Sequence, residues 1–467
     1  MKSCMRIAVI PAAVLVVLGA AGASAGGDTG LTHETIEKLK ESFELDPATR
    51  SIMNAVTNND VSKLTLNREL LARHNDVFNV KVDTKGVTDQ ESSGRCWLFA
   101  GFNIMRPSVM KKFNIDDFEF SENHLFFWDK LEKANMFLEA MIENRGKDVD
   151  DRELKVLFRN PVPDGGWWTY VVNLIGKYGA VPKCIMPETK NSSNTRRMNS
   201  LLNRMMRSDA AEIRRLASEG KDESTLRKRK FEMLSQVYRL LAIHLGIPPE
   251  EFVWRYEDKD GRVCGGTYTP LSFYTEAVED GLDGYVTLLS YPVHGYYEYY
   301  RIRYCRNMPD APDMDFINMD IGMLKEFALK AVLGGEPVWF AADVGKDHDV
   351  ENGIFEIGIH DYRTLIGVED RITKADRLLY CESTPNHAMV FIGADTLGGR
   401  ASKWLVENSW GTDRGKKGFW TMYDDWFDEH VFGVIVHKRY LPGDVLAIMD
   451  TEPKVLPAWD PMRSLFE

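Results

Sequence analysis

The sequence has few cysteines, and their spacing excludes two common cysteine-based architectures. Six cysteines are spread over 467 residues with no Cys-x-x-Cys pair. Such spacing is typical of neither a dense disulfide framework nor a structural zinc site. The ten histidines are also scattered, without two at metal-binding spacing on a predicted helix. We therefore expect no metal and no organic cofactor.

An excess of positive charge is also absent. The net charge is -12, which argues against a general polyanion-binding protein. Residues 190–240 are locally basic, with Arg227-Lys228-Arg229-Lys230 as their densest part. A solvated helix face is the commoner meaning of such a run, and binding of nucleic acid is the disfavoured alternative.

Long apolar runs are missing except at the N-terminus. Lys2 and Arg6 precede an uncharged stretch over residues 7–27, and Ala23-Ser24-Ala25 provides small residues suited to cleavage. This pattern predicts a signal peptide over residues 1–25 and an exported protein, periplasmic or extracellular, without stable membrane association after cleavage. An uncleaved anchor is the alternative, and a cytoplasmic location follows if the segment is not used.

One cysteine has the local context of a nucleophile. In residues 90–100, QESSGRCWLFA, turn residues precede Cys96 and apolar residues follow it, which predicts a loop entering a helix. The positive end of the helix dipole favours a thiolate at this position. The alternative is a buried core cysteine, since free cysteines are often buried.

A histidine and an asparagine later in the chain favour the catalytic interpretation. His387 enters a strand-like apolar run, and Asn408 follows another, with Ser409-Trp410-Gly411 after it. Cysteine, histidine and asparagine in this order, with Gln90 before the cysteine, are typical of papain-like cysteine peptidases.

The resemblance is to the bleomycin hydrolase and aminopeptidase C branch of that family. The segments that carry it are SGRCWLFA, FFWDKLEK, DGGWW, KYGAVPK, DVGK, NHAM, VENSWG and VLPAWDPM. It implies an α+β, two-lobed papain-like fold with a helical insertion and a C-terminal arm that reaches into its own cleft. It also implies a homohexamer that acts as an aminopeptidase on peptide substrates.

The distance between the cysteine and the histidine agrees with an insertion. A minimal papain-like domain separates them by ~130–150 residues, and here the separation is far larger. We divide the mature chain into an N-terminal arm with the helical lobe (26–183), the insertion (184–265), the remaining papain-like domain (266–452) and the C-terminal arm (453–467). Residues 120–145, aromatic and strongly helical, are interpreted as core packing.

The site roles follow from the motif and from the family likeness. Cys96 is the expected nucleophile, His387 its partner in a thiolate–imidazolium pair, and Asn408 the side chain that orients the imidazole ring. Trp410 is expected to shield that hydrogen bond, and Gln90 to donate to the oxyanion together with the Cys96 N–H.

Substrate contacts are expected at two further places. By resemblance, Gly165 and Gly166 line the non-primed side of the cleft; a tight turn that caps a helix is the alternative. Also by resemblance, a terminal carboxylate binds the substrate's α-amine, and Glu467 is the candidate. An endopeptidase or dipeptidyl peptidase using the same site is the competing function.

Overall fold

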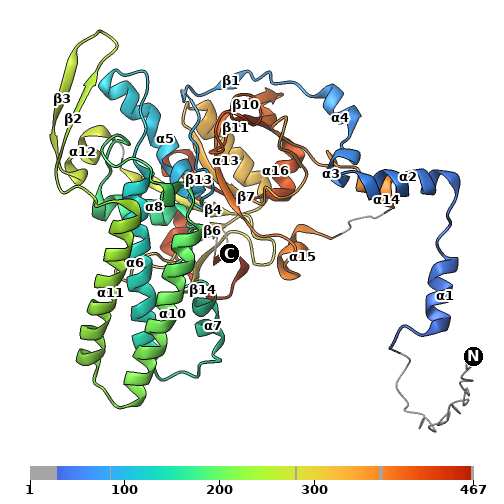
Figure 1. Cartoon of the computed structure of the whole chain (residues 1–467). Coiled ribbons are helices and arrows are strands. Elements are labelled where there is room, and N and C mark those ends of the chain that lie inside the picture. The colour runs from blue at the N-terminus through green and yellow to red at the C-terminus, as the bar shows by residue number, and fades with distance from the viewer. Residues whose placement is uncertain (1–28, 85, 279–280, 368–371, 464–467) are drawn as a thin grey trace, which may run out of the picture. The chain divides into compact units, whose positions relative to one another are not determined.

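The computed structural model describes residues 29–84, 86–278, 281–367 and 372–463 (Figure 1). By its internal contacts the chain divides into two units, Met1–Leu64 and Thr65–Glu467. The predicted signal peptide, residues 1–25, lies outside the described residues. Within the described ranges, no helix has both the length and the apolar character needed to cross a membrane.

The described part of the first unit is helical, as its sequence pattern predicts. Its helices are α1 (His33–Glu41), α2 (Pro47–Asn58) and α3 (Val61–Leu64). The side chains of Thr32 and Asp46 accept hydrogen bonds from the N–H groups of the first turns of α1 and α2. These caps satisfy donors that a helix start leaves without an intrahelical partner.

The second unit is built on one large mixed sheet. The strand order is β14-β5-β6-β4-β13-β7-β10-β11-β12-β9-β8, and β1 pairs with β10. Their bounds are β1 Val80–Lys81, β4 Tyr285–Leu289, β5 Glu298–Ile302, β6 Asp315–Asn318, β7 Val338–Ala342, β8 His348–Asp349, β9 Ile354–Phe355, β10 His387–Leu397, β11 Arg400–Glu407, β12 Phe419–Tyr423, β13 Val431–His437 and β14 Lys454–Leu456. The sheet holds His387 at the first residue of β10, opposite Ala342 of β7.

Several helices gather beside one half of this sheet (Figure 1). The helices of the unit are α4 Arg68–Arg73, α5 Cys96–Phe113, α6 Glu122–Glu143, α7 Arg152–Arg159, α8 Trp168–Tyr178, α9 Lys190–Ser193, α10 Arg196–Ser218, α11 Glu223–Leu245, α12 Pro270–Ala277, α13 Ile321–Leu333, α14 Tyr362–Ile366, α15 Lys374–Leu379, α16 Asp424–His430 and α17 Gly443–Ala447. Helix α5 is buried along nearly its whole length and packs against β10. This packing brings the start of α5 to the start of β10, although the two are far apart in the sequence.

The segment expected as a helical insertion, residues 184–265, is helical only as far as Leu245. Helices α10 and α11 pack against each other and against α6, and each buries apolar residues spaced three or four apart. The strands β2 (Phe252–Glu257) and β3 (Val263–Tyr268) then form an antiparallel hairpin that runs past residue 265. Phe252 and Trp254 are buried while Val253 is exposed. This alternation explains why a strand forms there instead of a helix.

The C-terminal arm is extended only in part. Strand β14 pairs in parallel with β5, but Pro461–Arg463 then form a 3-10 turn. The Asp460 carboxylate accepts the N–H of Met462 at 2.9 Å, which closes this turn. A proline-rich stretch alone predicts only the extended part, because the turn depends on this side-chain contact.

Candidate active site

Cys96 is the first residue of α5, as the turn residues before it predict. The Arg95 carbonyl accepts the first hydrogen bonds of the helix, from the N–H groups of Leu98 and Phe99 at 2.9 and 3.1 Å. No side chain caps this helix start. The positive end of the α5 dipole therefore lies at the Cys96 thiol, where it stabilises negative charge.

The backbone around Cys96 is held by a buried arginine. Arg95 lies between the rings of Phe99 and Phe126, with its guanidinium carbon 5.2 and 5.3 Å from the ring centroids. Its guanidinium forms an ion pair with Glu188 at 2.9 Å and is fully buried. A buried charge needs such a partner, so the residue before the nucleophile has a fixed position.

His387 and Asn408 lie where the sequence motif predicts, at the facing ends of β10 and β11. The His387 Nε2 atom is 2.8 Å from Asn408 Oδ1. An amide oxygen only accepts, so Nε2 carries the proton and Nδ1 is the basic nitrogen of the neutral imidazole. The backbone N–H of Ala388, the residue after His387, lies 3.3 Å from Cys96 Sγ and donates to it. The thiol and the histidine are thus in one buried cluster.

Trp410 covers this cluster. Its ring lies 4.8 Å from the His387 ring, centroid to centroid, at an interplanar angle of 32°. Trp410 is half-buried, and Trp420 packs edge-on against it at 5.4 Å. We expect an apolar ring in this place to keep water from the hydrogen bond between His387 and Asn408, which would strengthen it.

Gln90 is hydrogen-bonded to Ser409, the residue that follows Asn408. Its Oε1 accepts from the Ser409 hydroxyl at 2.7 Å, and its Nε2 donates to the Ser93 carbonyl at 2.5 Å. The backbone N–H of Gln90 also donates to the Ser409 carbonyl at 2.9 Å. An amide nitrogen has two protons, so one remains for an oxyanion after the bond to Ser93. The Gln90 side chain therefore needs little movement to donate this proton to an oxyanion.

Burial opposes charge on both reacting groups. Cys96 and His387 have 0% and 2% of their surface exposed. Burial raises the pKa of the Cys96 thiol, against the opposing effect of the Ala388 N–H. Burial also lowers the pKa of His387 to about 4, against the Asn408 hydrogen bond. The expected thiolate–imidazolium pair therefore depends on the attraction between its two charges and on the α5 dipole.

The Gly165-Gly166 loop lies next to the nucleophile's helix. A Cβ atom on Gly166 would lie 2.8 Å from the Trp97 ring, which leaves room for glycine only. The Trp97 indole N–H donates to the Asp164 carbonyl at 2.9 Å. The loop and the helix start are thus packed directly together, with Trp97 next to Cys96 in the chain.

Two lysines of α6 contact this loop. Lys133 Nζ donates to the carbonyls of Gly165 at 2.7 Å and Pro163 at 3.0 Å, and forms an ion pair with Asp129 at 2.6 Å. Lys130 forms an ion pair with Asp164 at 2.5 Å. Lys130, Lys133 and Asp129 are buried. They fix the loop's backbone relative to α5.

Sequence reasoning missed these lysines, because residues 120–145 were interpreted as core packing alone. The signal available was the run Asp129-Lys130 followed by Lys133, which places charge on an otherwise aromatic and buried helix. Charged residues are almost never fully buried unless they are paired. Such a run on a buried helix therefore indicates that these charged side chains have polar partners inside the protein.

Comparisons with known proteins agree with this geometry. The model of the Peptidase C1-like family matches residues 30–463. Human bleomycin hydrolase is 38% identical over 94% of this chain and 99% of its own length. Aminopeptidase C of Streptococcus thermophilus is 37% identical over 94% of this chain and 99% of its own length. The crystal structure of PepW from Lactobacillus rhamnosis superposes with a TM-score of 0.90 at 36% identity, covering 93% of this chain and 99% of that one.

The chain belongs to the Peptidase C1-like family. It is a cysteine peptidase with the papain-like fold, which confirms the family, the fold class and the enzyme class predicted from the sequence. The catalytic roles of the individual residues remain predictions, which rest on the geometry described above.

The C-terminal arm of this C1-like peptidase reaches the glycine loop. The Trp167 indole N–H donates to the Arg463 carbonyl at 3.2 Å. A narrow pocket beside Gly165 and Gly166 is lined by Trp167 and Arg463. Glu467, the candidate for the terminal carboxylate, lies outside the described residues.

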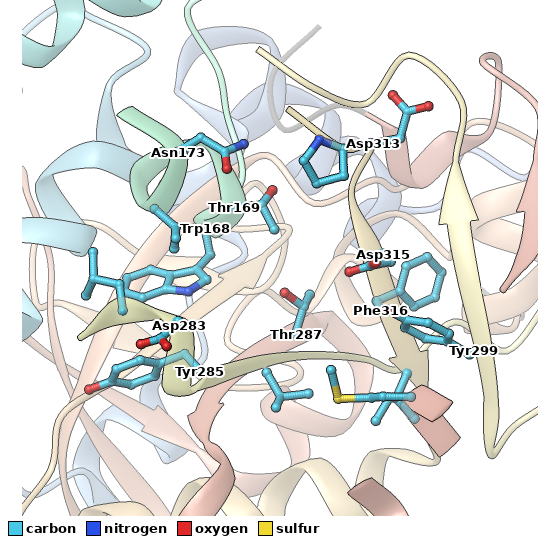
Figure 2. Close-up of a pocket in the computed structure, with 16 residues that line it drawn as sticks. Trp168, Thr169, Asn173, Asp283, Tyr285, Thr287, Tyr299, Asp313, Asp315 and Phe316 are labelled. Atoms are coloured by element: carbon cyan, nitrogen blue, oxygen red, sulfur yellow. The ribbon is translucent and has the colours of Figure 1, made fainter. Parts of the chain in front are cut away.

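A second cavity of this peptidase is separate from the predicted site. It lies between α8, which contributes Trp168 and Thr169, and the strands β4 and β6, which contribute Thr287 and Phe316 (Figure 2). None of the predicted site residues lines it. We therefore assign it no part in catalysis.

Proposed function

We propose that this protein is a cysteine aminopeptidase that hydrolyses peptide bonds near the free N-terminus of peptides. The relatives named aminopeptidase C and bleomycin hydrolase support this function. The observation that carries it is the buried cluster in which Ala388 N–H binds Cys96 Sγ and Asn408 orients His387. Acyl transfer requires a nucleophile and an oriented base of this kind.

The reaction proceeds in two displacements. His387 Nδ1 takes the thiol proton of Cys96, and the resulting Sγ thiolate attacks the carbonyl carbon of the scissile bond. Gln90 and the Cys96 N–H bind the oxyanion of the tetrahedral intermediate. His387 then gives its proton to the leaving amine, and a thioester forms. Water, deprotonated by His387, attacks the thioester, and Cys96 leaves as the acid product is released.

The arm decides which bonds reach the thiol. Its last described residue, Arg463, lies on the glycine loop, the side on which papain-like enzymes bind residues before the scissile bond. An arm in that place leaves room for only a short N-terminal segment of substrate. A carboxylate at the chain end, for which Glu467 is our candidate, would pair with the substrate's α-amine.

Product analysis tests this function. Wild-type protein should cleave a peptide with a free α-amine and should be nearly inactive on the same peptide with an acetylated N-terminus. Cys96→Ala should abolish both activities while far-UV circular dichroism and the melting temperature stay close to wild type. Turnover retained by Cys96→Ala would refute the assignment of the nucleophile.

Deletion of residues 463–467 separates an aminopeptidase gated by its arm from an ordinary endopeptidase. The truncated protein should gain cleavage at internal bonds of N-acetylated peptides, because the obstruction is gone. A truncated protein that keeps strict dependence on a free α-amine would contradict the gating role of the arm. Equal wild-type activity on blocked and free peptides would favour the endopeptidase alternative.

We also propose export and assembly into a homohexamer. Export is supported by the basic residues and apolar run over residues 1–25, and hexamer formation by likeness to the family. Fractionation of cells followed by N-terminal sequencing would show cleavage after Ala25 if the first is right. Light scattering of the mature protein should give about six times the mass of one chain if the protein is a hexamer. The mass of a single chain would contradict the hexamer.

A further inference from the structure

We propose that Trp167 and Cys305 are positioning residues that together fix the C-terminal arm and thereby set how many residues the enzyme releases. We call this pair the arm clamp. The proposal rests on the function proposed above and adds what determines the length of the product. It assigns a role to a buried cysteine that the catalytic mechanism does not use.

Both residues of the arm clamp donate to one atom. The Trp167 indole N–H lies 3.2 Å from the Arg463 carbonyl oxygen, and Cys305 Sγ lies 3.0 Å from the same oxygen. Each of the two donors has only 1% of its surface exposed. A carbonyl oxygen has two lone pairs, so both are occupied by these donors. The arm backbone is therefore fixed at the Arg463 carbonyl.

A neighbouring tyrosine orients the Cys305 donor. Tyr170 donates its hydroxyl proton to Cys305 Sγ at 3.7 Å, which leaves the thiol proton for Arg463. Burial raises the pKa of Cys305 to about 12, so this sulfur stays a protonated donor at neutral pH. It is therefore neither a competing nucleophile nor a charged group beside the arm.

The clamp is connected to the nucleophile through packed side chains. The Trp167 ring lies 6.3 Å from the Trp339 ring, centroid to centroid. The Trp339 indole N–H donates to the carbonyl of Trp97, the residue after Cys96, at 3.1 Å. All three tryptophans are buried. Closely packed interiors resist deformation, so the position of Arg463 is fixed relative to Cys96.

The arm is also held before it reaches the clamp. The N–H of Arg303 donates to the Leu456 carbonyl at 3.1 Å, next to the β5–β14 pairing. The Asp460 carboxylate lies 3.3 Å from the Tyr291 hydroxyl and 3.4 Å from His294 Nε2. These contacts keep the arm attached when the clamp is weakened. The arm clamp then determines the position of Arg463.

Register matters because each residue of an extended chain spans roughly 3.3–3.6 Å. A shift of the arm's end by this distance would therefore change the available cleft by one residue of an extended substrate. With the clamp intact, the enzyme should release fragments of one main length. With the clamp weakened, fragments of neighbouring lengths should appear.

The test is mass spectrometry of the fragments released from a free-amine peptide that carries the same residue at every position. Trp167→Phe removes one donor and keeps an aromatic ring, and Cys305→Ala removes the other. Each should raise the share of the minor fragment lengths by roughly fivefold, as expected for one lost hydrogen bond. Cys305→Ser keeps a donor and should keep the wild-type pattern.

The matched control is Cys184→Ala, since Cys184 is an exposed cysteine; it should match wild type. Folding is checked by the melting temperature, and Trp167→Phe decides the matter if Cys305→Ala does not fold. An unchanged fragment pattern in a folded, active Trp167→Phe enzyme would overturn the clamp while leaving the aminopeptidase proposal intact. Absence of aminopeptidase activity in wild type would instead overturn the proposed function.

Discussion

At the scale of single residues, the site depends on how strongly Asn408 supports His387. Burial lowers the pKa of His387, and the Asn408 hydrogen bond is the opposing influence. Asn408→Ala removes that bond, so both the imidazolium and the ring orientation should be lost. We expect kcat/KM to fall by roughly 10²-fold, measured over pH 4–9.

The control for this prediction is the stability of the variant. Asn408 is buried, so its replacement could also lower the free energy of unfolding. Urea denaturation of Asn408→Ala separates the two effects, because a folded variant with lost turnover has lost a catalytic contact. A folded variant with unchanged kcat/KM would show that the ring is oriented without this residue.

Gln90 offers a matched pair of substitutions. Gln90→Glu keeps the oxygen that accepts from the Ser409 hydroxyl but replaces the amide donor with a carboxylate. We expect it to lower kcat by at least about 10²-fold with little change in KM, since the donor binds only the developing oxyanion. Gln90→Ala should lose less, because it adds no negative charge. Equal rates in Gln90→Glu and wild type would exclude Gln90 from the oxyanion site.

At the scale of secondary-structure elements, α6 supports the Gly165-Gly166 loop through its buried charges. Lys133→Met keeps much of the side-chain volume but removes the donor to Gly165 and leaves Asp129 without its closest partner. We expect a loss of about 3–5 kcal/mol in the free energy of unfolding, measured by urea denaturation. KM should also rise as the loop loosens.

The double variant Lys133→Met with Asp129→Leu provides the control for that prediction. Removing both charges avoids an unpaired buried carboxylate, so part of the lost stability should return. The increase in KM should remain, because the Gly165 carbonyl still lacks its donor. If the double variant were as unstable as Lys133→Met, the stabilisation by Lys133 would come mainly from its contact to Gly165 and not from its ion pair with Asp129.

Asp164 makes stability depend on pH at the same loop. Burial alone would raise the pKa of this carboxyl group, but the Lys130 ammonium and the Thr195 hydroxyl lower it from 3.8 to about 2. Because the pKa of Asp164 is lower in the folded than in the unfolded protein, its ionisation stabilises the fold at pH values above the unfolded-state pKa. This stabilisation is lost as the pH falls through the folded-state pKa. The difference in stability between wild type and Asp164→Asn, about 2 kcal/mol from this shift at neutral pH, should therefore vanish between pH 4 and pH 2.

Elements with a strong local pattern were predictable from the sequence. The helix that begins at Cys96 and the strand that begins at His387 lie where turn residues and apolar runs indicate. The hairpin of β2 and β3 was missed, because it follows two long helices and its alternation covers only a few residues. Contacts such as Lys133 to Gly165 were beyond prediction, since no local pattern specifies which distant backbone a buried charge will meet.

At the scale of the whole molecule, the distribution of charge bears on the remaining alternative, nucleic-acid binding. The densest basic run lies on α11, where Arg227 pairs with Glu139 at 2.7 Å and Arg229 with Glu212 at 2.8 Å. Lys230 also pairs with Glu139. Cations already paired with carboxylates release few counterions when a polyanion approaches, and the chain as a whole is negative.

We therefore expect no salt-dependent binding of duplex DNA. In a fluorescence anisotropy titration, any retention at 50 mM salt should be weak and should change little when the salt is raised to about 200 mM, whereas several phosphate contacts would lower affinity by roughly 10³-fold or more. The variant Glu139→Gln with Glu212→Gln is the sensitive control, because it removes one carboxylate partner each from Arg227 and Arg229 and should introduce a measurable salt slope. A steep slope in the wild type would show instead that these arginines exchange their carboxylate partners for phosphates.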